Sequence, residues 1–456
     1  MRVVLYAARF PEERLTLAPL GLGYVASYLL AQGGAEVEIV DSVDEAIRLQ
    51  PNIVGVSSVS QVVDDARSFA QRCREATGCV AVLGGYHVTG LPQALPEEFD
   101  YGVLSEGEET FSELVALLSR GRPSPEALER IPGIVYRRDG RVLTTTRRPF
   151  IKELDGLPRP LRHRRYSDDS GIFTSRGCPY RCTFCASHGH WGDAFRLRRA
   201  ESVVSEIEEL IEAEHPKEIV ILDDLWMANK GRFREIVDRL YAKGIPGKVT
   251  FRGFCRSNLI QEEDILLLKR MNYRVIRFGA ETGSESLLKR LKGKGISIAD
   301  HQRVIDLSER HGMPCTASFM FGIPGETERD LKATIRFLLR NRGKLAIAGL
   351  YLFNPIPGTA LWSELAREGL VSEHLPFGRL RIDMLKSNFP WEDPLYFNER
   401  KVPLSVLRRY VEDAIAISRG ETPKTHDTED GFLSRMVRKG TKLVRGRSQA
   451  RRERRA

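Results

Sequence analysis

Three cysteines stand within eight residues of one another, at Cys178, Cys182 and Cys185, in the spacing C-x3-C-x2-C. They follow a short apolar run, and the glycine and proline around them predict a turn after a strand. Such a loop directs three thiolates to one centre and supplies no fourth. Three thiolates on a [4Fe–4S] cluster leave one iron open to a small molecule, which favours chemistry over a structural role. The alternative is a Cys3His zinc site, with His188 or His190 as the fourth ligand.

The cysteine spacing, with Phe184 directly before the third cysteine, resembles the signature of the radical S-adenosylmethionine (SAM) superfamily. The resemblance implies that Cys178, Cys182 and Cys185 hold a [4Fe–4S] cluster whose open iron is chelated by the amino and carboxylate groups of SAM. It also implies that Phe184 lies near the adenine. A zinc loop does not predict the motifs that follow in the chain, so the cluster is the stronger interpretation.

The chain after the cysteine loop alternates between strand-like and helix-like patterns, which predicts a partial (β/α)6 barrel over residues 171–360. The repeat is about 30 residues long, as in βαβ units. Six repeats fall short of a closed eight-fold barrel. Strands are expected at 172–175, 217–222, 248–254, 274–279, 315–321 and 347–353. Helices are expected near 201–214, 231–242, 261–270, 298–311 and 327–340.

Polar residues follow the second and third of these strands, where reacting groups of βα barrels lie. Asp223 and Asp224 could hydrogen-bond the SAM ammonium group or the substrate, and a solvated pair of carboxylates is the alternative. Arg256 could pair with the SAM carboxylate through a bidentate bond, or it could be structural.

Two later strand ends extend the resemblance to the superfamily. Phe278–Ser284 resembles its Glu-Ser/Thr-Gly motif, which implies that Glu281 bonds the ribose hydroxyls of SAM. Met320–Thr327 resembles its adenine-side segment, which implies that Gly322 and Ile323 lie beside the adenine. These segments follow the cysteine loop in the expected order, so together they are a stronger signal than any one alone.

The first 150 residues alternate short apolar runs with helical patterns, which predicts a doubly wound, Rossmann-like parallel sheet. Strands are expected at 3–6, 37–40, 53–56, 80–83 and 101–103, and helices at 18–32, 61–76 and 108–119. Ligands of such sheets lie at the carboxyl ends of strands, where this chain has Ser58, Gly84, Gly85 and Glu106. The glycine pair either permits close approach of something bulky or only makes a turn.

These strand ends resemble the cobalamin-binding domain of the cobalamin-dependent radical SAM enzymes. The matching segments are Pro19–Tyr24, Gly84–His87 and Ser105–Glu108. The resemblance implies that the four strand-end residues named above contact cobalamin. The motif Asp-x-His-x-x-Gly is missing, so we expect cobalamin with its own base displaced and no histidine in its place. His87 follows the glycine pair and is expected to be structural.

The other segments are a linker, a C-terminal region and a tail. Proline stiffens the linker over residues 151–170. The C-terminal region, 361–430, is mostly helical and is expected to shape the substrate cavity, with helices near 359–369 and 403–419. The tail, 431–456, has apolar residues spaced as in a short amphipathic helix with a basic face. We expect it to be solvated, with contact to a membrane surface or to nucleic acid as the alternatives.

Composition agrees with a protein of two or three domains, since the chain has 456 residues, of which 42% are hydrophobic and 29% charged. The sequence has no run of about 18 apolar residues, so no membrane-spanning helix is predicted. The formal charge of +9 arises in the tail, because the rest of the chain has 60 basic and 60 acidic residues. Three of the seven cysteines cluster and four are scattered, which indicates a reducing cytoplasm. The scattered ones are expected to be small buried hydrophobes: Cys73, Cys79, Cys255 and Cys315.

The combined motifs favour a C-methyltransferase that acts on an unactivated carbon of a small metabolite or natural-product intermediate. The cofactors implied are a [4Fe–4S] cluster, SAM and cobalamin, with a 5′-deoxyadenosyl radical, methylcobalamin and an electron donor such as flavodoxin or ferredoxin. Ring contraction, cyclisation or rearrangement without methyl transfer is an alternative, and so is a non-catalytic cobalamin sensor, which would not need the three cysteines. A tRNA methylthiotransferase is disfavoured because only Cys73 and Cys79 precede the cysteine loop.

Overall fold

The structure is a computed structural model that describes residues 1–164 and 166–423. The chain forms two compact units. Among the described residues, the first consists of Met1–Phe254, Leu267–Tyr273 and Pro355–Leu380, and the second of Cys255–Leu266, Arg274–Asn354 and 381–423. The basic tail predicted for 431–456 lies outside the described residues. No helix of the described part is long and apolar enough to cross a membrane.

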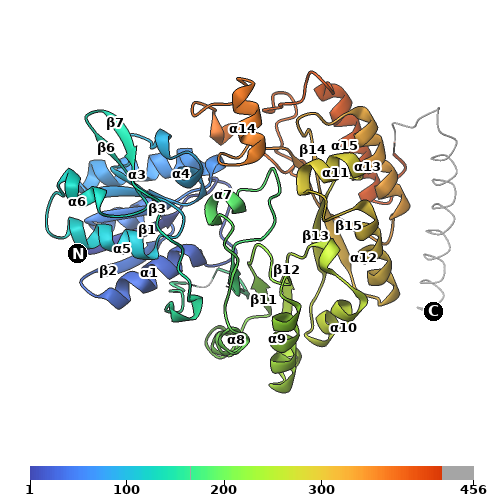
Figure 1. Cartoon of the computed structure of the whole chain (residues 1–456), viewed down its shortest axis with the longest axis horizontal. Coiled ribbons are helices and arrows are strands. Elements are labelled where there is room, and N and C mark those ends of the chain that lie inside the picture. The colour runs from blue at the N-terminus through green and yellow to red at the C-terminus, as the bar shows by residue number, and fades with distance from the viewer. Residues whose placement is uncertain (165, 424–456) are drawn as a thin grey trace. The chain divides into compact units, whose positions relative to one another are not determined.

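The first unit begins with a seven-stranded sheet in the order β2-β1-β3-β4-β5-β6-β7 (Figure 1). Its five parallel strands confirm the predicted ranges to within a residue or so: β1 Arg2–Ala7, β2 Glu36–Val40, β3 Ile53–Ser57, β4 Val80–Gly84 and β5 Tyr101–Val103. An antiparallel hairpin, β6 Ile134–Arg138 and β7 Arg141–Thr144, completes the edge. Three longer helices join the parallel strands, α1 Leu20–Gln32, α3 Val63–Thr77 and α5 Glu108–Leu118, with short turns of helix at α2 Val43–Arg48, α4 Tyr86–Gly90 and α6 Pro125–Glu129.

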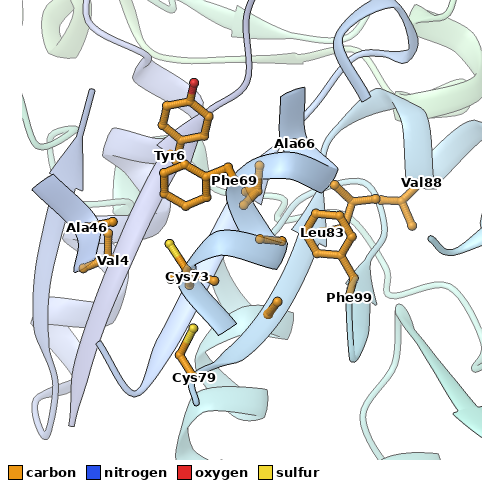
Figure 2. Packing of buried hydrophobic residues seen from close by; sticks show 14 of the residues in the cluster. Val4, Tyr6, Ala46, Ala66, Phe69, Cys73, Cys79, Leu83, Val88 and Phe99 are labelled. Atoms are coloured by element: carbon orange, nitrogen blue, oxygen red, sulfur yellow. The ribbon is translucent and has the colours of Figure 1, made fainter. Parts of the chain in front are cut away.

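Two hydrophobic clusters cover this sheet, because its strands are apolar on both sides. One cluster packs α3 against the sheet, and in it the rings of Tyr6 and Phe69 stack with centroids 4.0 Å apart. Figure 2 shows this cluster with the thiols of Cys73 and Cys79 inside it. The other cluster contains residues of α1 and α5, including Leu29 and Leu114. The sheet is therefore wound with helices on both sides, as predicted.

The first unit continues into a three-stranded parallel sheet, β12-β11-β8. Its elements are β8 Asp169–Ile172, α8 Ala200–Glu214, β11 Glu218–Ile221, α9 Lys230–Ala242 and β12 Thr250–Gly253. Strand β8 ends three residues before the predicted end at 175, because the chain turns away at Thr174 and Ser175 starts an antiparallel pair. That pair joins β9 Ser175–Arg176 to β10 Arg196–Leu197. The unit also includes α7 Ser187–Trp191 and α14 Ala360–Arg367.

The second unit is built on another three-stranded parallel sheet, β13-β14-β15. The strands are β13 Ile276–Glu281, β14 Cys315–Phe321 and β15 Ala346–Leu352, and the helices are α11 Glu285–Lys292, α12 Ile298–Arg310, α13 Glu328–Arg340 and α15 Leu404–Ser418. Helix α10, Glu262–Arg270, was also predicted, whereas α11 was not. Helices α12 and α13 begin with capping boxes, Ser297 with Asp300 and Thr327 with Asp330, which explains why their starts were readable. The predicted α/β fold class is confirmed.

Candidate functional site

A cavity of about 330 Å³ lies in the first unit, at the carboxyl ends of the strands of the seven-stranded sheet. Its lining is mostly apolar and includes Leu5, Val82 and Phe111, from β1, β4 and α5. Polar residues also line it, among them Ser57 and Glu106. This volume is at the lower end of the range for ligand pockets, roughly 300–1,000 Å³. Cobalamin, with a corrin ring and a nucleotide tail, is larger, so the cavity fits one part of it.

The two glycines predicted at the end of β4, Gly84 and Gly85, are each needed for a different physical reason. Both line the cavity. A Cβ added to Gly84 would meet nothing closer than Val56 O at 3.9 Å, so this glycine keeps space open. Gly85 has φ +93°, and a Cβ there would stand 2.7 Å from Ser58 O. Gly85 is therefore required by the turn itself, whereas Gly84 leaves room for a ligand.

The last residue of β3, Ser57, lines the cavity, whereas the predicted Ser58 does not. Ser58 is buried, and its backbone accepts from His87 N–H at 3.1 Å and donates to Gly84 O at 3.0 Å. His87 is buried as well, with Nδ1 3.0 Å from Ser60 Oγ, and burial lowers its pKa to about 4. These bonds support the structural role expected of His87. Contact between Ser58 and a cofactor stays a prediction.

Glu106 lines the cavity and takes part in a buried ion cluster. Arg176 donates to Glu106 Oε1 at 2.5 Å and to Glu108 Oε1 at 2.6 Å. Arg196 donates to Glu106 Oε2 at 2.8 Å, and the backbone N–H of Ile151 donates to the same oxygen at 2.9 Å. Because Arg176 stands two residues before Cys178, this cluster joins the end of β5 to the base of the cysteine loop. Sequence reasoning had no signal for Arg176, since its partners lie 68 and 70 residues away.

The three cysteines of the loop, Cys178, Cys182 and Cys185, are half-buried. Burial raises the pKa of the Cys185 thiol to about 12. Among residues 1–164 and 166–423, no three His, Cys, Asp or Glu side chains converge as one metal ion requires. A cubane distributes its three thiolates over three irons, so these thiols fit a cluster better than a single zinc ion. Nearby, Phe184 is half-buried.

The two histidines proposed as the fourth zinc ligand, His188 and His190, both contact other groups in the structure. His188 Nδ1 lies 3.0 Å from the carbonyl oxygen of Gly192. His190 is buried, lines the cavity, and stacks on Tyr86 with ring centroids 4.3 Å apart. Burial lowers the pKa of His190 to about 3, with further lowering by nearby arginines such as Arg147.

The start of α14 and the segment before it pack against the same region. Leu361 N–H donates to Thr183 O, inside the cysteine loop, at 3.0 Å. A Cβ on Gly90 would stand 2.5 Å from Pro357 O, and one on Gly189 would stand 2.9 Å from Gly358 O. These glycines allow the backbones of α4, α7 and this segment to approach one another closely.

The two aspartates after β11, Asp223 and Asp224, have different surroundings. Asp223 is fully buried and accepts from the backbone N–H and the hydroxyl of Thr174, at 2.6 and 2.5 Å, and from Ser175 Oγ at 2.5 Å. It thereby fixes the end of β8 just ahead of the cysteine loop. Asp224 lines the cavity instead, and burial raises the pKa of its carboxyl group. The contact predicted between Asp223 and SAM stays a prediction.

In the second unit, Glu281 ends β13 with a positive φ of 63°. Its Oε1 lies 2.7 Å from Lys292 Nζ, which also donates to Gly279 O at 2.6 Å. Arg256 Nη2 donates to Lys292 O at 3.3 Å. Lys292 on α11 therefore connects two residues that sequence motifs predicted to bind SAM, and it was not predicted.

The glycine-rich segment after β14 is held by Glu326. The N–H of Gly322 donates to Glu326 Oε2 at 2.7 Å, and Asn398 donates to Glu326 O at 2.9 Å. Gly322 has φ +73°, and a Cβ there would stand 2.8 Å from a methyl group of Leu352. Ile323 is fully buried. These hydrogen bonds and the positive φ of Gly322 fix the conformation of the turn. The contact of Gly322 and Ile323 with adenine stays a prediction.

Residues 172–338 match the Radical SAM superfamily, and residues 14–115 match the B12 binding domain. These two domains define the chain as a radical SAM enzyme with a cobalamin-binding domain. It belongs to the family of cobalamin-dependent radical SAM enzymes, whose cofactors are a [4Fe–4S] cluster, SAM and cobalamin. The predictions of family, enzyme class and cofactors are thereby confirmed.

An uncharacterized methyltransferase of Pyrococcus horikoshii is 32% identical over 366 residues, covering 75% of this chain and 77% of that protein. An anaerobic magnesium-protoporphyrin IX monomethyl ester cyclase of Rubrivivax gelatinosus is 27% identical, covering 76% of this chain and 66% of that protein. The structure of the radical SAM methyltransferase TsrM of Kitasatospora setae, with cobalamin and a [4Fe–4S] cluster, aligns with a TM-score of 0.72 at 19% identity. It covers 97% of this chain and 99% of that one, which supports the predicted Rossmann-like domain followed by a partial barrel.

Proposed function

We propose that this protein is a C-methyltransferase that acts on an unactivated carbon of a small metabolite or natural-product intermediate. One observation carries the proposal: Arg176 lines the cavity at the strand ends and stands two residues before the first cysteine of the loop. A cavity suited to cobalamin and a loop suited to an iron–sulfur cluster are thus joined through one side chain. The P. horikoshii relative, which carries the name of a methyltransferase, supports the same conclusion.

When bound, the cluster and SAM supply a 5′-deoxyadenosyl radical for hydrogen abstraction, and methylcobalamin supplies the methyl group. The chain itself holds the groups and excludes water. We assign the cluster to Cys178, Cys182 and Cys185. On the cobalamin side, Gly84 leaves the space, and Glu106 orders the strand end through its bonds to Arg176.

For SAM, the motif positions support four contacts: Phe184 and Ile323 beside the adenine, Glu281 on the ribose hydroxyls, and Arg256 on the carboxylate. The ion pair of Lys292 with Glu281 holds that carboxylate in one orientation before SAM arrives. Asp224, in the wall of the cavity, is better placed than Asp223 to meet a ligand.

The proposal includes an electron donor such as flavodoxin or ferredoxin, because the cluster must be reduced once in each cycle. It also includes a reducing cytoplasm, in keeping with a chain in which three cysteines cluster and four are scattered. The proposal also includes contact of the tail 431–456 with a membrane surface. Binding of anionic vesicles by the protein with and without residues 431–456 tests this contact.

Anaerobic protein with a reconstituted cluster, cobalamin, reductant and SAM tests the function. Candidate substrates are offered with SAM deuterated in its methyl group. We expect 5′-deoxyadenosine, S-adenosylhomocysteine and a product that carries the deuterated methyl group. Cys178→Ala should form none of the three. Absence of both nucleoside products with the wild-type protein would contradict an enzymatic role and favour the cobalamin sensor.

A second candidate is cyclisation, ring contraction or rearrangement without methyl transfer. The observation that favours it is the similarity to the R. gelatinosus cyclase. The same assay separates the two, because this reaction gives 5′-deoxyadenosine without stoichiometric S-adenosylhomocysteine.

A further inference from the structure

His190 is a buried histidine in the wall of the cavity that none of the motifs explains. It lies in α7, five residues after the last cysteine of the loop, and the residue is 7% exposed. None of the described residues forms a hydrogen bond with its Nδ1 atom. A buried polar atom without a partner is unusual and calls for an explanation, such as a bound ligand.

The imidazole of His190 is held in one orientation by its neighbours. It stacks on Tyr86 at an interplanar angle of 27°, and the edge of Trp191 meets it with centroids 4.5 Å apart. Tyr86 directly follows Gly84 and Gly85, so the ring stands beside the open space that Gly84 leaves. These two rings restrict the orientation of the imidazole before a ligand binds, so little side-chain entropy is lost on binding.

The chemistry of the ring matches the rim of a corrin. Burial keeps the imidazole neutral, so it offers one N–H donor and one acceptor nitrogen. The corrin ring of cobalamin carries primary amide side chains, each with both a donor and an acceptor. Either tautomer of His190 can therefore pair with such an amide.

We propose that His190 binds cobalamin directly, through a hydrogen bond between its imidazole and an amide side chain of the corrin. The proposal rests on the cobalamin site named under the proposed function. Through this hydrogen bond, helix α7, which follows the cysteine loop, would contact cobalamin as well as the cluster loop. Because the chain lacks the Asp-x-His-x-x-Gly motif, no histidine is expected to ligate cobalt. The proposed contact is consistent with this expectation, since His190 binds the corrin rim and not the metal.

Equilibrium binding of hydroxocobalamin, followed by its visible absorption, tests this contact in protein with a reconstituted cluster. His190→Phe keeps a ring between Tyr86 and Trp191 and removes both nitrogens. We expect its dissociation constant to rise about tenfold, which corresponds to about 1.4 kcal/mol. His190→Gln, which retains a donor and an acceptor, should stay within about threefold of the wild type.

His188→Phe is the matched control, because His188 lies on the same short helix and does not line the cavity. It should bind cobalamin as the wild type does. Unchanged binding by His190→Phe would overturn the proposal, and equal losses in His190→Phe and His190→Gln would show that the ring only packs. Nitrogen hyperfine splitting from labelled histidine in the electron paramagnetic resonance spectrum of cob(II)alamin would also overturn it, since this would show ligation of cobalt.

Failure of this contact is distinguishable from failure of the proposed function. Binding is measured without substrate, so a wild-type protein that binds cobalamin but transfers no methyl group would contradict the function alone. A wild-type protein that binds no cobalamin would overturn both.

Discussion

Arg176 Nη1 donates a hydrogen bond to Glu106 Oε1 at 2.5 Å, in an ion pair whose side chains are only 8% and 5% exposed. The pair joins the cobalamin-type sheet to the residue stretch that leads into the cysteine loop. Arg176 also lies over the rings of Tyr24 and Trp191, with its guanidinium carbon 4.9 and 6.0 Å from their centroids. A buried cation that meets carboxylates and aromatic faces together fixes the position of the loop.

Loss of this cation should be costly, because removal of one partner of a buried ion pair leaves uncompensated charge. For Arg176→Met we expect a loss of about 3–5 kcal/mol in the free energy of unfolding. Urea unfolding of the protein without cofactors measures it. Arg72→Met is the control, since Arg72 pairs with Asp44 at an exposed position and should lose less than about 1 kcal/mol. Equal effects of the two changes would contradict the role given to Arg176.

The three loop cysteines should each be necessary for the cluster. Cys178→Ala, Cys182→Ala and Cys185→Ala should each lower the iron content of anaerobically reconstituted protein from about four atoms per chain to near zero. Iron and sulfide analysis measures this. Cys315→Ala, at a buried thiol elsewhere, should retain the full cluster. Iron-free protein that holds zinc tightly through the same three cysteines would contradict the assignment.

The adjacent glycines after β4 should respond differently to substitution. Gly84→Val places methyl groups in open space, so it should weaken cobalamin binding at least about tenfold with little effect on stability. Gly85→Ala should instead cost about 1–3 kcal/mol of stability, because its φ is +93° and Ser58 O is in the way. Cobalamin titration and urea unfolding separate the two effects. Gly247→Ala, at an open position, is the control for both. Strong cobalamin binding by Gly84→Val would place the cofactor elsewhere.

Glu326 should make stability depend on pH in a direction opposite to that of most carboxylates. Burial raises its pKa from 4.5 to about 8, so the folded state keeps a proton that the unfolded state releases. This contribution is complete below about pH 4.5 and is lost as the pH rises through about 8. Compared with Glu326→Gln, the wild type should lose stability between pH 5 and 8, by at most about 1.4 kcal/mol per pH unit.

Urea midpoints of both proteins across this pH range measure the difference. Glu328→Gln is the matched control, because a hydrogen bond from the Tyr410 hydroxyl lowers the pKa of Glu328. Glu328 is then ionised in both states above pH 5, so its difference from the wild type should stay constant. A constant difference for Glu326→Gln as well would show that Glu326 is ionised in the fold.

Much of the fold was readable from the sequence because it follows from local patterns. Strand β14 occupies 315–321 as predicted, since a short and mostly apolar segment between Pro314 and Gly322 is typical of a buried strand. The spacing of Cys178, Cys182 and Cys185 was also readable, because all three lie within eight consecutive residues. Strand β8 was misplaced by three residues because Thr174 bonds a carboxylate 49 residues away.

The amino-acid sequence alone determined the order of the βα units, the cysteine loop and the glycines at the strand ends, because each depends on neighbours a few residues apart. Only the tertiary structure decided that Asp223 is enclosed while Asp224 lines the cavity, and that Arg176 and His190 lie beside Gly84 and Glu106. Burial and pairing of this kind depend on segments that are distant in the chain and meet only in the fold. No local pattern of residue types records which of two adjacent carboxylates will face the solvent, the core or a ligand.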